Sequence, residues 1–161
     1  MSNIRYIRPF FAVTGAPRAE DVAAAAALGF KAIVSNLPDG ESGLHLSSTA
    51  EARLAAEAGL AFRHIPATKS EVFTDRVVQG MDQALRELEG PVLAHCASGL
   101  RSALAWAAAA ARYQSADCVL AVLSSAGFDL AAARGQLQAQ GVRPHAASMP
   151  AALDCQCDER G

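Results

Sequence analysis

Short apolar runs alternate with longer amphipathic segments along most of this chain of 161 residues. Apolar runs of four to six residues, each bounded by Gly, Pro or polar turns, are typical of buried strands. Segments with apolar residues at helical spacing and a Gly after them are typical of helices. The pattern predicts strands at 10–13, 31–35, 60–65 and 92–95, and helices at 19–28, 48–58, 71–88, 101–113, 116–126 and 130–140.

Repeated strand–helix units favour an α/β fold with a mostly parallel sheet of about four to five strands, covered by helices on both faces. We expect one domain over residues 1–150 and a polar C-terminal tail over 151–161. Ser47 or Ser48 is expected to cap the helix at 48–58, with Glu51 completing a capping box. In parallel sheets of this kind, ligands bind beyond the carboxyl ends of the strands.

The charge balance argues against nucleic acid and anionic membranes as partners. Fourteen Lys and Arg against sixteen Asp and Glu give a formal net charge of −2. No apolar stretch approaches the roughly 20 residues of a membrane-spanning helix. The first residues, Met-Ser-Asn-Ile-Arg-Tyr, lack the apolar core of a signal peptide. We therefore expect a cytoplasmic protein.

Four cysteines in a chain of this length do not indicate a disulfide framework. Cys118 lies on the apolar face of a predicted helix and is interpreted as a core residue. Cys155 and Cys157 fall in the polar tail, where they are either part of a disordered segment or relay thiols for another cysteine. His145 is the one nearby ligand that could help them, so we expect no metal site and no cofactor.

The stretch Pro91-Val-Leu-Ala-His95-Cys96-Ala-Ser-Gly99-Leu-Arg101-Ser102 carries the candidate chemistry. This order of residues predicts a strand, then a short anion-binding loop, then the N-terminus of a helix. The helix dipole, the loop amides and Arg101 would stabilise the thiolate of Cys96, which makes it a candidate nucleophile. We interpret His95 as a loop-shaping residue and Ser102 as a hydrogen-bond partner of the Cys96 sulfur.

The spacing within this loop separates two chemistries. Cysteine-dependent phosphatases have five residues between the Cys and the Arg, which makes room for a phosphoryl group. Here four residues, Ala97, Ser98, Gly99 and Leu100, form the anion-binding loop between Cys96 and Arg101. The segment resembles the active loop of single-domain rhodaneses, which are sulfurtransferases with a loop of this length.

Most of the chain also resembles the phosphatase-like domain of bacterial beta-lactamase-hydrolase-like proteins. Four segments carry the resemblance: Gly15-Ala-Pro17, Ser35-Asn-Leu-Pro-Asp-Gly-Glu41, Ala58-Gly-Leu-Ala-Phe-Arg-His-Ile-Pro66 and Gly90-Pro-Val-Leu-Ala-His-Cys96. The resemblance implies a fold like that of the dual-specificity phosphatases. Because the family also occurs fused to persulfide-dioxygenase-like domains, it further implies a setting in sulfide metabolism and a functional link to such an enzyme.

The favoured hypothesis is a sulfurtransferase. Cys96 would take the outer sulfur of thiosulfate or glutathione persulfide as a persulfide, and a thiol acceptor would then remove it. Arg101 would pair with the anionic leaving group, and the loop N–H groups would stabilise the persulfide. Such leaving groups are stable anions and need no proton donor.

Two alternatives stay open. A phosphatase would form a phosphocysteine on Cys96, bind phosphoryl oxygens through Arg101 and need an acid for the leaving oxygen. Dual-specificity phosphatases carry that Asp after the strand matched here by Phe62-Arg-His-Ile65; here Glu71 is the possible substitute, although a first-turn helix acid is the simpler interpretation. A non-catalytic anion-binding domain would keep Arg101 and the loop amides without a reactive thiol.

Overall fold

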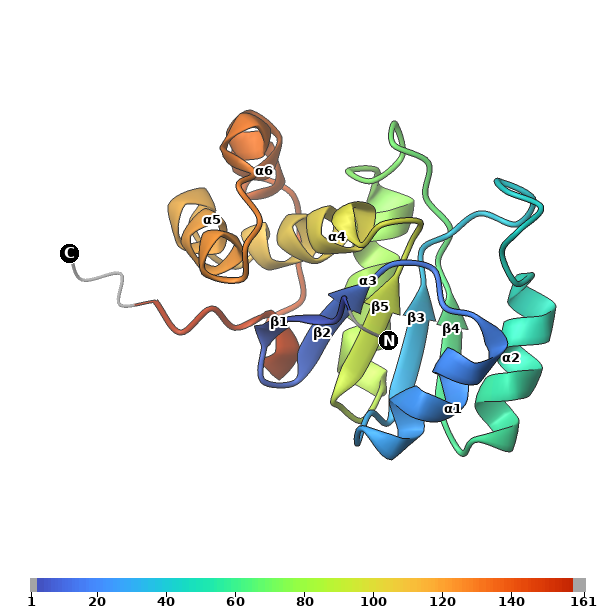
Figure 1. Ribbon diagram of the computed structural model, residues 1–161. Coiled ribbons are helices and arrows are strands. Elements are labelled where there is room, and N and C mark those ends of the chain that lie inside the picture. The colour runs from blue at the N-terminus through green and yellow to red at the C-terminus, as the bar shows by residue number, and fades with distance from the viewer. Residues whose placement is uncertain (1–2, 158–161) are drawn as a thin grey trace.

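A computed structural model describes residues 3–157 of the chain. A five-stranded sheet with the order β1-β2-β5-β3-β4 forms its centre (Figure 1). The last four of these strands are parallel, and β1 adds an antiparallel edge to β2. The strands are β1 (Arg5–Arg8), β2 (Phe11–Thr14), β3 (Ala32–Ser35), β4 (Ala61–His64) and β5 (Val92–His95). The predicted fold class, a mostly parallel α/β domain, is confirmed.

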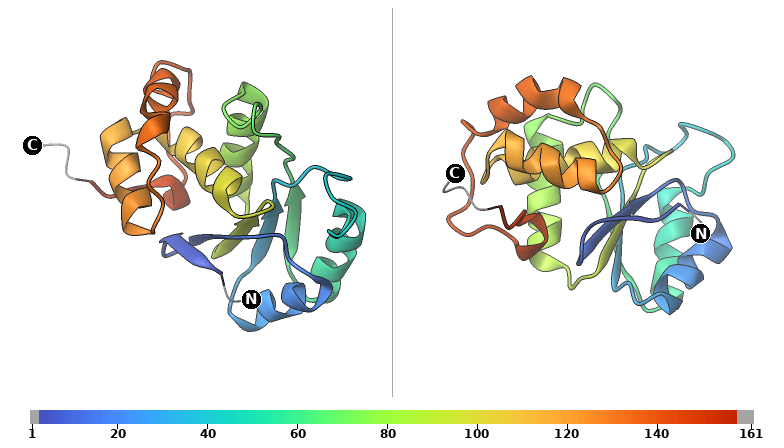
Figure 2. Two further views of the ribbon diagram at one scale, coloured as in Figure 1. Left: turned by 45° about the horizontal axis from the view of Figure 1, so that its top comes forward. Right: turned by 60° about the vertical axis from the view of Figure 1, so that its left-hand side comes forward.

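Six α-helices are found within residues 3–157, and they cover both faces of the sheet. Helices α1 and α2 lie on one face and α3 and α4 on the other, with α5 and α6 packed outside α4 (Figures 1 and 2). The helices are α1 (Ala19–Ala27), α2 (Ser48–Glu57), α3 (Asp75–Glu87), α4 (Leu100–Ala111), α5 (Ala116–Ser125) and α6 (Arg134–Gln140). Two apolar cores follow from this arrangement, because alternate residues of each strand point to opposite faces.

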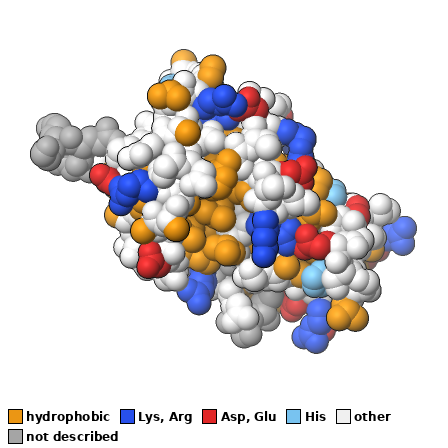
Figure 3. All heavy atoms as spheres, turned by 90° about the horizontal axis from the view of Figure 1, so that it is seen from above, with side chains coloured by type: hydrophobic (Ala, Val, Ile, Leu, Met, Phe, Trp, Pro, Cys, Tyr) orange, Lys and Arg blue, Asp and Glu red, His pale blue; other side chains and the backbone are white. Residues whose placement is uncertain are grey.

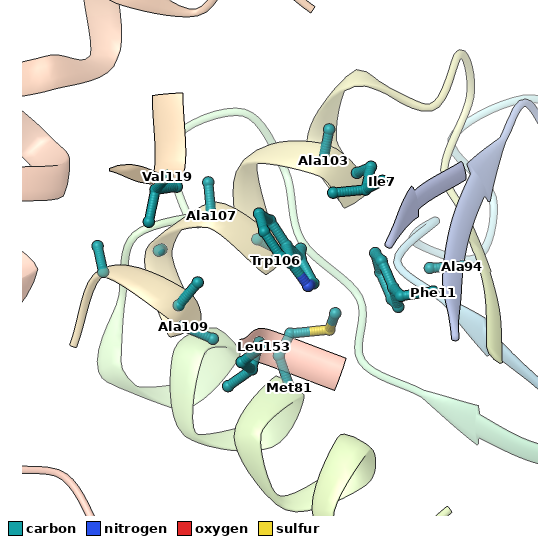
Figure 4. Packing of buried hydrophobic residues seen from close by; sticks show 14 of the residues in the cluster. Ile7, Phe11, Met81, Ala94, Ala103, Trp106, Ala107, Ala109, Val119 and Leu153 are labelled. Atoms are coloured by element: carbon teal, nitrogen blue, oxygen red, sulfur yellow. The ribbon is translucent and has the colours of Figure 1, made fainter. Parts of the chain in front are cut away.

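The larger core is built around helix α4, whose side chains from Ala103 to Ala111 are mostly alanine. These small side chains allow neighbouring helices to approach closely. Trp106 is fully buried, stacks with Phe11 at 6.2 Å between ring centroids, and lies beside Met81 and Leu153 (Figure 4). Its indole N–H donates to Ala152 O at 2.9 Å, so the one polar group of this core side chain has a partner.

The C-terminal segment packs against this core as far as the structure describes it. Leu153 is fully buried within a short 3-10 turn, Ala151–Leu153, and the Gln114 side chain bonds Leu153 O and the Cys155 N–H. The boundary expected at residue 150 stays a prediction. Residues 151–155 nevertheless belong to the packed body, and residues 158–161 of the expected tail lie outside the described range.

The structure differs most from the sequence expectation in one additional strand and in where two helices begin. Strand β1 was not expected, because only Ile7 of its four residues is buried and two arginines flank it. Helix α3 begins at Asp75 rather than Glu71, because residues 68–74 form turns that end at the Thr74 cap. Helix α6 begins at Arg134, after a separate 3-10 turn over Ala131–Ala133.

The surface carries charges of both signs. Seen from above, cationic and anionic side chains are interspersed around a strip of apolar ones (Figure 3). Over residues 3–157 no helix is both long enough and apolar enough to cross a membrane.

Candidate active site

Cys96 lies at the carboxyl edge of the sheet, between β5 and the N-terminus of α4. The preceding residue, His95, pairs with Thr14 of β2 and Ser35 of β3, so two neighbouring strands fix where the loop begins. The thiol of Cys96 is fully buried, and its Sγ accepts a hydrogen bond from the Gly99 N–H at 3.1 Å. The loop therefore folds back over its own cysteine, and a loop amide points at the sulfur.

Gly99 makes this turn possible. Its φ is +97°, in the left-handed region that favours glycine, and a Cβ there would meet Thr14 O at 3.4 Å. Gly15 closes the same corner from the other side, since a Cβ on it would lie 3.1 Å from Ala97 O. Ala97, Ser98 and Leu100 are exposed along the rim of the loop, whereas Gly99 is buried beneath them.

Arg101 is held by an acid that sequence reasoning did not select. Its guanidinium donates from Nη1 to Glu41 Oε1 at 2.8 Å and from Nη2 to Glu41 Oε2 at 2.6 Å, and Nη1 also donates to Ala67 O. These bonds raise the pKa of Arg101, Glu41 contributing most and Cys96 adding to it. Arg101 lies in the first turn of α4, five residues after Cys96.

Ser102 does not fill the role expected for it. Its hydroxyl donates to Asn36 Oδ1 at 2.7 Å, so its hydroxyl hydrogen is directed to Asn36 and not to the Cys96 sulfur. Asn36 is itself fully buried and donates from Nδ2 to Ile65 O at 2.9 Å. This chain of bonds ties the first turn of α4 to the ends of β3 and β4.

His95 is joined to Glu51 of helix α2. The distance from His95 Nε2 to Glu51 Oε2 is 2.6 Å, and the two side chains are each 2% exposed. The capping box expected for Glu51 is therefore wrong. Ser47 caps α2 as expected, accepting from the Ala50 N–H at 3.1 Å, but the Glu51 carboxylate turns inward to His95.

Glu71, the possible general acid, is tied down by other groups. It precedes α3 rather than lying in its first turn, which corrects the simpler interpretation as well. Its Oε1 accepts from the Thr68 N–H at 2.9 Å and its Oε2 pairs with Arg76 at 3.4 Å. These contacts, the Thr68 backbone bond first, lower the pKa of Glu71, whereas a proton donor at neutral pH needs a raised one.

Other polar residues near this edge have structural partners. The His64 ring is hydrogen-bonded through Nε2 to Leu37 O at 2.9 Å. Asp39 accepts two bonds from Ser48, which lower its pKa. Arg63 and Lys69 are exposed, and the positive charge of Lys69 helps to lower the pKa of Glu41.

The remaining cysteines belong to another part of the molecule. Cys118 of α5 is buried in the core, as predicted, but it also forms a disulfide with Cys157, which the sequence did not predict. The partner lies 39 residues away, beyond the reach of any local pattern. Cys155 is a buried free thiol whose pKa burial raises to about 11. Within residues 3–157 no cluster of three or more metal-binding side chains is found.

Sequence reasoning missed Glu41, Asn36 and Glu51. The signal for the first two was available: both follow β3, which is the neighbour of β5 in the sheet, so their loop opens beside Cys96. Glu51 gives no such signal, because a carboxylate in the first turn of a helix is ordinary.

Comparison with known proteins places this site in a recognisable setting. The family model for the beta-lactamase hydrolase-like protein, phosphatase-like domain, matches residues 3–113, which include the whole Cys96 loop. The beta-lactamase hydrolase-like protein of Agrobacterium fabrum is 33% identical over 137 residues, 83% of this chain and 31% of that protein. That of Xylella fastidiosa is 31% identical over 134 residues, 82% of this chain and again 31% of the relative. The chain thus spans about a third of the length of the curated relatives it matches.

Solved structures show the same architecture. A candidate phosphatase from Neisseria meningitidis has a TM-score of 0.74 and 27% identity, over 85% of this chain and 97% of that one. The core catalytic domain of a PP-IP phosphatase from S. cerevisiae has a TM-score of 0.59 at 14% identity, over 89% of this chain and 86% of that one. The second likeness concerns the fold alone.

Proposed function

The chain belongs to the phosphatase-like domain family of the beta-lactamase hydrolase-like proteins, and on that premise we propose that it is a cysteine-dependent phosphatase acting through Cys96. One observation carries the proposal. Cys96 is buried directly after β5, the Gly99 amide of the loop donates to its sulfur, and Arg101 lies in the first turn of α4. A phosphoryl group needs a nucleophile, N–H donors for its oxygens and a cation, and this corner supplies all three.

The reaction proceeds in two displacements. The Cys96 thiolate attacks phosphorus, an S–P bond forms, and the P–O bond to the leaving group breaks with its electron pair on oxygen. Water then attacks the phosphocysteine, the S–P bond breaks, and inorganic phosphate and the thiolate are released. The loop amides and Arg101 stabilise the charge on the equatorial oxygens in both steps.

Leaving groups of low basicity suit this site. Glu71 and Asp39, acids on the loops at this edge of the sheet, have lowered pKa values and are hydrogen-bonded to neighbours. A weakly basic aryl oxide such as 4-nitrophenoxide leaves without being protonated first, whereas an alkoxide or a tyrosine phenoxide needs an acid. We therefore propose phosphates of acidic phenols, whose leaving oxides are weak bases, as the substrate class.

Sulfur transfer is the second candidate, and the four-residue spacing between Cys96 and Arg101 favours it. The thiolate would attack the outer sulfur of thiosulfate, forming Cys96 persulfide while sulfite leaves with the bonding pair. An acceptor thiolate would then attack the outer sulfur and release the Cys96 thiolate. With this candidate we also propose a cytoplasmic location, these thiol partners and a functional link to a persulfide dioxygenase.

A paired assay of the wild type and Cys96→Ser tests both candidates. Release of 4-nitrophenol from its phosphate and formation of thiocyanate from thiosulfate plus cyanide are followed side by side. Cys155→Ser is the matched control, because it removes the other free thiol, which lies in the C-terminal segment beside Gln114. Phosphate release that needs Cys96 but not Cys155 supports the phosphatase. Thiocyanate formation that needs Cys96 but not Cys155 supports the second candidate. If neither activity is detected, the anion-binding domain is the remaining interpretation.

A further inference from the structure

The buried pair of Glu51 and His95 is the part of the molecule that the proposed reaction leaves without a role. Glu51 comes from helix α2 and His95 from the last position of β5, 44 residues further along the chain. Their side chains meet at 2.6 Å, and each is 2% exposed. His95 immediately precedes Cys96, so a carboxylate on one face of the sheet reaches the residue from which the active loop starts.

The surroundings do not explain this carboxylate as a packing element. Helix α2 otherwise packs into an apolar core through Ala55, beside Leu60 and Ile33. Burial of a carboxylate among such side chains is unfavourable unless it is paired, and a buried pair contributes little net stability compared with apolar residues of equal size. The N-terminus of the helix is capped by Ser47 without any help from Glu51. Stability alone therefore gives no reason for Glu51 to be there.

The bond determines which nitrogen of His95 carries the proton. A carboxylate only accepts, so Nε2–H must donate to Glu51. The other nitrogen, Nδ1, is buried and has no hydrogen-bond partner among residues 3–157. A proton on Nδ1 in the neutral ring would be a buried donor without an acceptor, which is costly. Glu51 thus selects the Nε2–H tautomer and fixes the plane of the ring.

The backbone of His95 is fixed from the opposite direction. Its carbonyl accepts from the Asn36 N–H at 2.7 Å, and the strands on both sides pair with it. With the backbone held by strands and the ring held by Glu51, His95 has little freedom to rotate. The next residue then presents its sulfur to the Gly99 N–H in one geometry.

We propose that Glu51 is a positioning residue for the Cys96 reaction and that it acts through His95. The inference rests on Cys96 being the nucleophile of the proposed function. Glu51 itself touches neither substrate nor sulfur. Its effect is to keep the start of the loop rigid, so that the thiolate and the loop amides stay aligned for attack.

Kinetics of a double-mutant cycle test this inference. Displacement of a reacting group by a distant substitution can cost about 10²-fold, so Glu51→Ala should lower kcat by up to that factor and change KM little. Glu51→Gln keeps the shape and an acceptor oxygen, and should recover most of the loss. Glu57→Gln, at the exposed end of the same helix, is the matched control and should leave kcat unchanged.

The cycle partner is His95→Asn. If Glu51 acts through His95, the double variant should be no slower than His95→Asn alone, because the two losses are shared. Additive losses, or a Glu51→Gln variant as slow as Glu51→Ala, would overturn the inference. If Glu51→Ala does not fold, Glu51→Gln takes its place in the cycle, with 15N NMR of His95 as the second readout. A wild-type ring protonated on Nδ1 alone would also overturn it.

The same variants can also be compared without any substrate, by measuring the rate at which iodoacetamide alkylates Cys96. Peptide mass spectrometry assigns the label to Cys96. Slower alkylation in Glu51→Ala, absent in Glu57→Gln, supports the positioning role even where the phosphatase assay is silent. Unchanged alkylation in a folded Glu51→Ala variant would contradict it, whichever reaction Cys96 performs.

Discussion

Arg101 and Glu41 form a two-pronged ion pair across the candidate site, with both carboxylate oxygens accepting from the guanidinium at 2.8 and 2.6 Å. The Arg101 side chain is 10% exposed and that of Glu41 is 33% exposed, so the pair lies at the mouth of the site. Ala67 O accepts a third bond on the same side. The guanidinium is thereby oriented before any ligand arrives.

Removal of the Glu41 charge should weaken anion binding. In Glu41→Gln the amide can accept only one guanidinium hydrogen bond, so Arg101 must be ordered by the ligand itself. Hydrogen bonds to charged groups contribute about 1.5–3 kcal/mol, so the Kd for inorganic phosphate should rise about tenfold or more. Calorimetric titration measures it. Tighter phosphate binding by the variant would mean that Glu41 competes with the ligand instead of orienting Arg101.

Asp75 should make folding stability depend on acid pH. Its Oδ1 accepts from Arg143 and Arg112, at 2.7 and 2.8 Å, and these bonds, that of Arg143 first, lower its pKa below 3.8. A lowered folded pKa stabilises the protein above the unfolded value, and the contribution is lost as pH falls through the folded one. Asp75→Asn should therefore be less stable than the wild type at neutral pH, with the difference disappearing well below pH 3.8.

Urea unfolding at neutral pH and at a pH well below 3.8 measures the free energy of unfolding of both proteins. Glu87→Gln, an exposed acid on the same helix, is the control. A stability difference between Asp75→Asn and the wild type that stays the same at both pH values would show that the two arginine bonds do not cause it.

Leu153 tests whether the C-terminal segment belongs to the folded unit. The side chain is fully buried in the core around Trp106, so Leu153→Ala should cost about 2–5 kcal/mol of unfolding free energy. Val142 is 86% exposed, and Val142→Ala should change the free energy of unfolding by no more than about 0.5 kcal/mol. Urea unfolding compares the two. Equal effects would mean that residues 151–155 are not held against α4 in solution.

Local pattern was enough to predict the sheet, most helices and the Cys96 loop. Strands such as 92–95 are buried on both faces and read as continuous apolar runs, and Gly stops mark the helix ends. Strand β1 is not predictable in this way, because the edge strand Arg5–Arg8 buries only one side chain and therefore contains no apolar run. Helix α3 was extended too far toward its N-terminus, because the turn made by Thr68 and Glu71 resembles a helical first turn in sequence.

The partners within the site could not be predicted in the same way. Arg101 meets Glu41 across 60 residues, His95 meets Glu51 across 44, and Cys118 meets Cys157 across 39. Each contact depends on which strands are neighbours and how the helices pack on them. A sequence pattern reports burial and periodicity, and neither identifies the polar residue that will lie opposite another.

The tied-down state of Glu71 predicts how the reaction depends on its leaving group. A positioned general acid contributes about 10²–10⁴-fold, so without one kcat/KM for an alkyl phosphate should fall at least about 10²-fold below that for 4-nitrophenyl phosphate. Glu71→Gln should leave both values within about twofold of the wild type, because a carboxylate with a lowered pKa has no proton to give at neutral pH. Steady-state kinetics on the two substrates decide the matter. Comparable rates on both substrates, lost together in Glu71→Gln, would establish Glu71 as the acid and require its bonds to Thr68 and Arg76 to break on substrate binding.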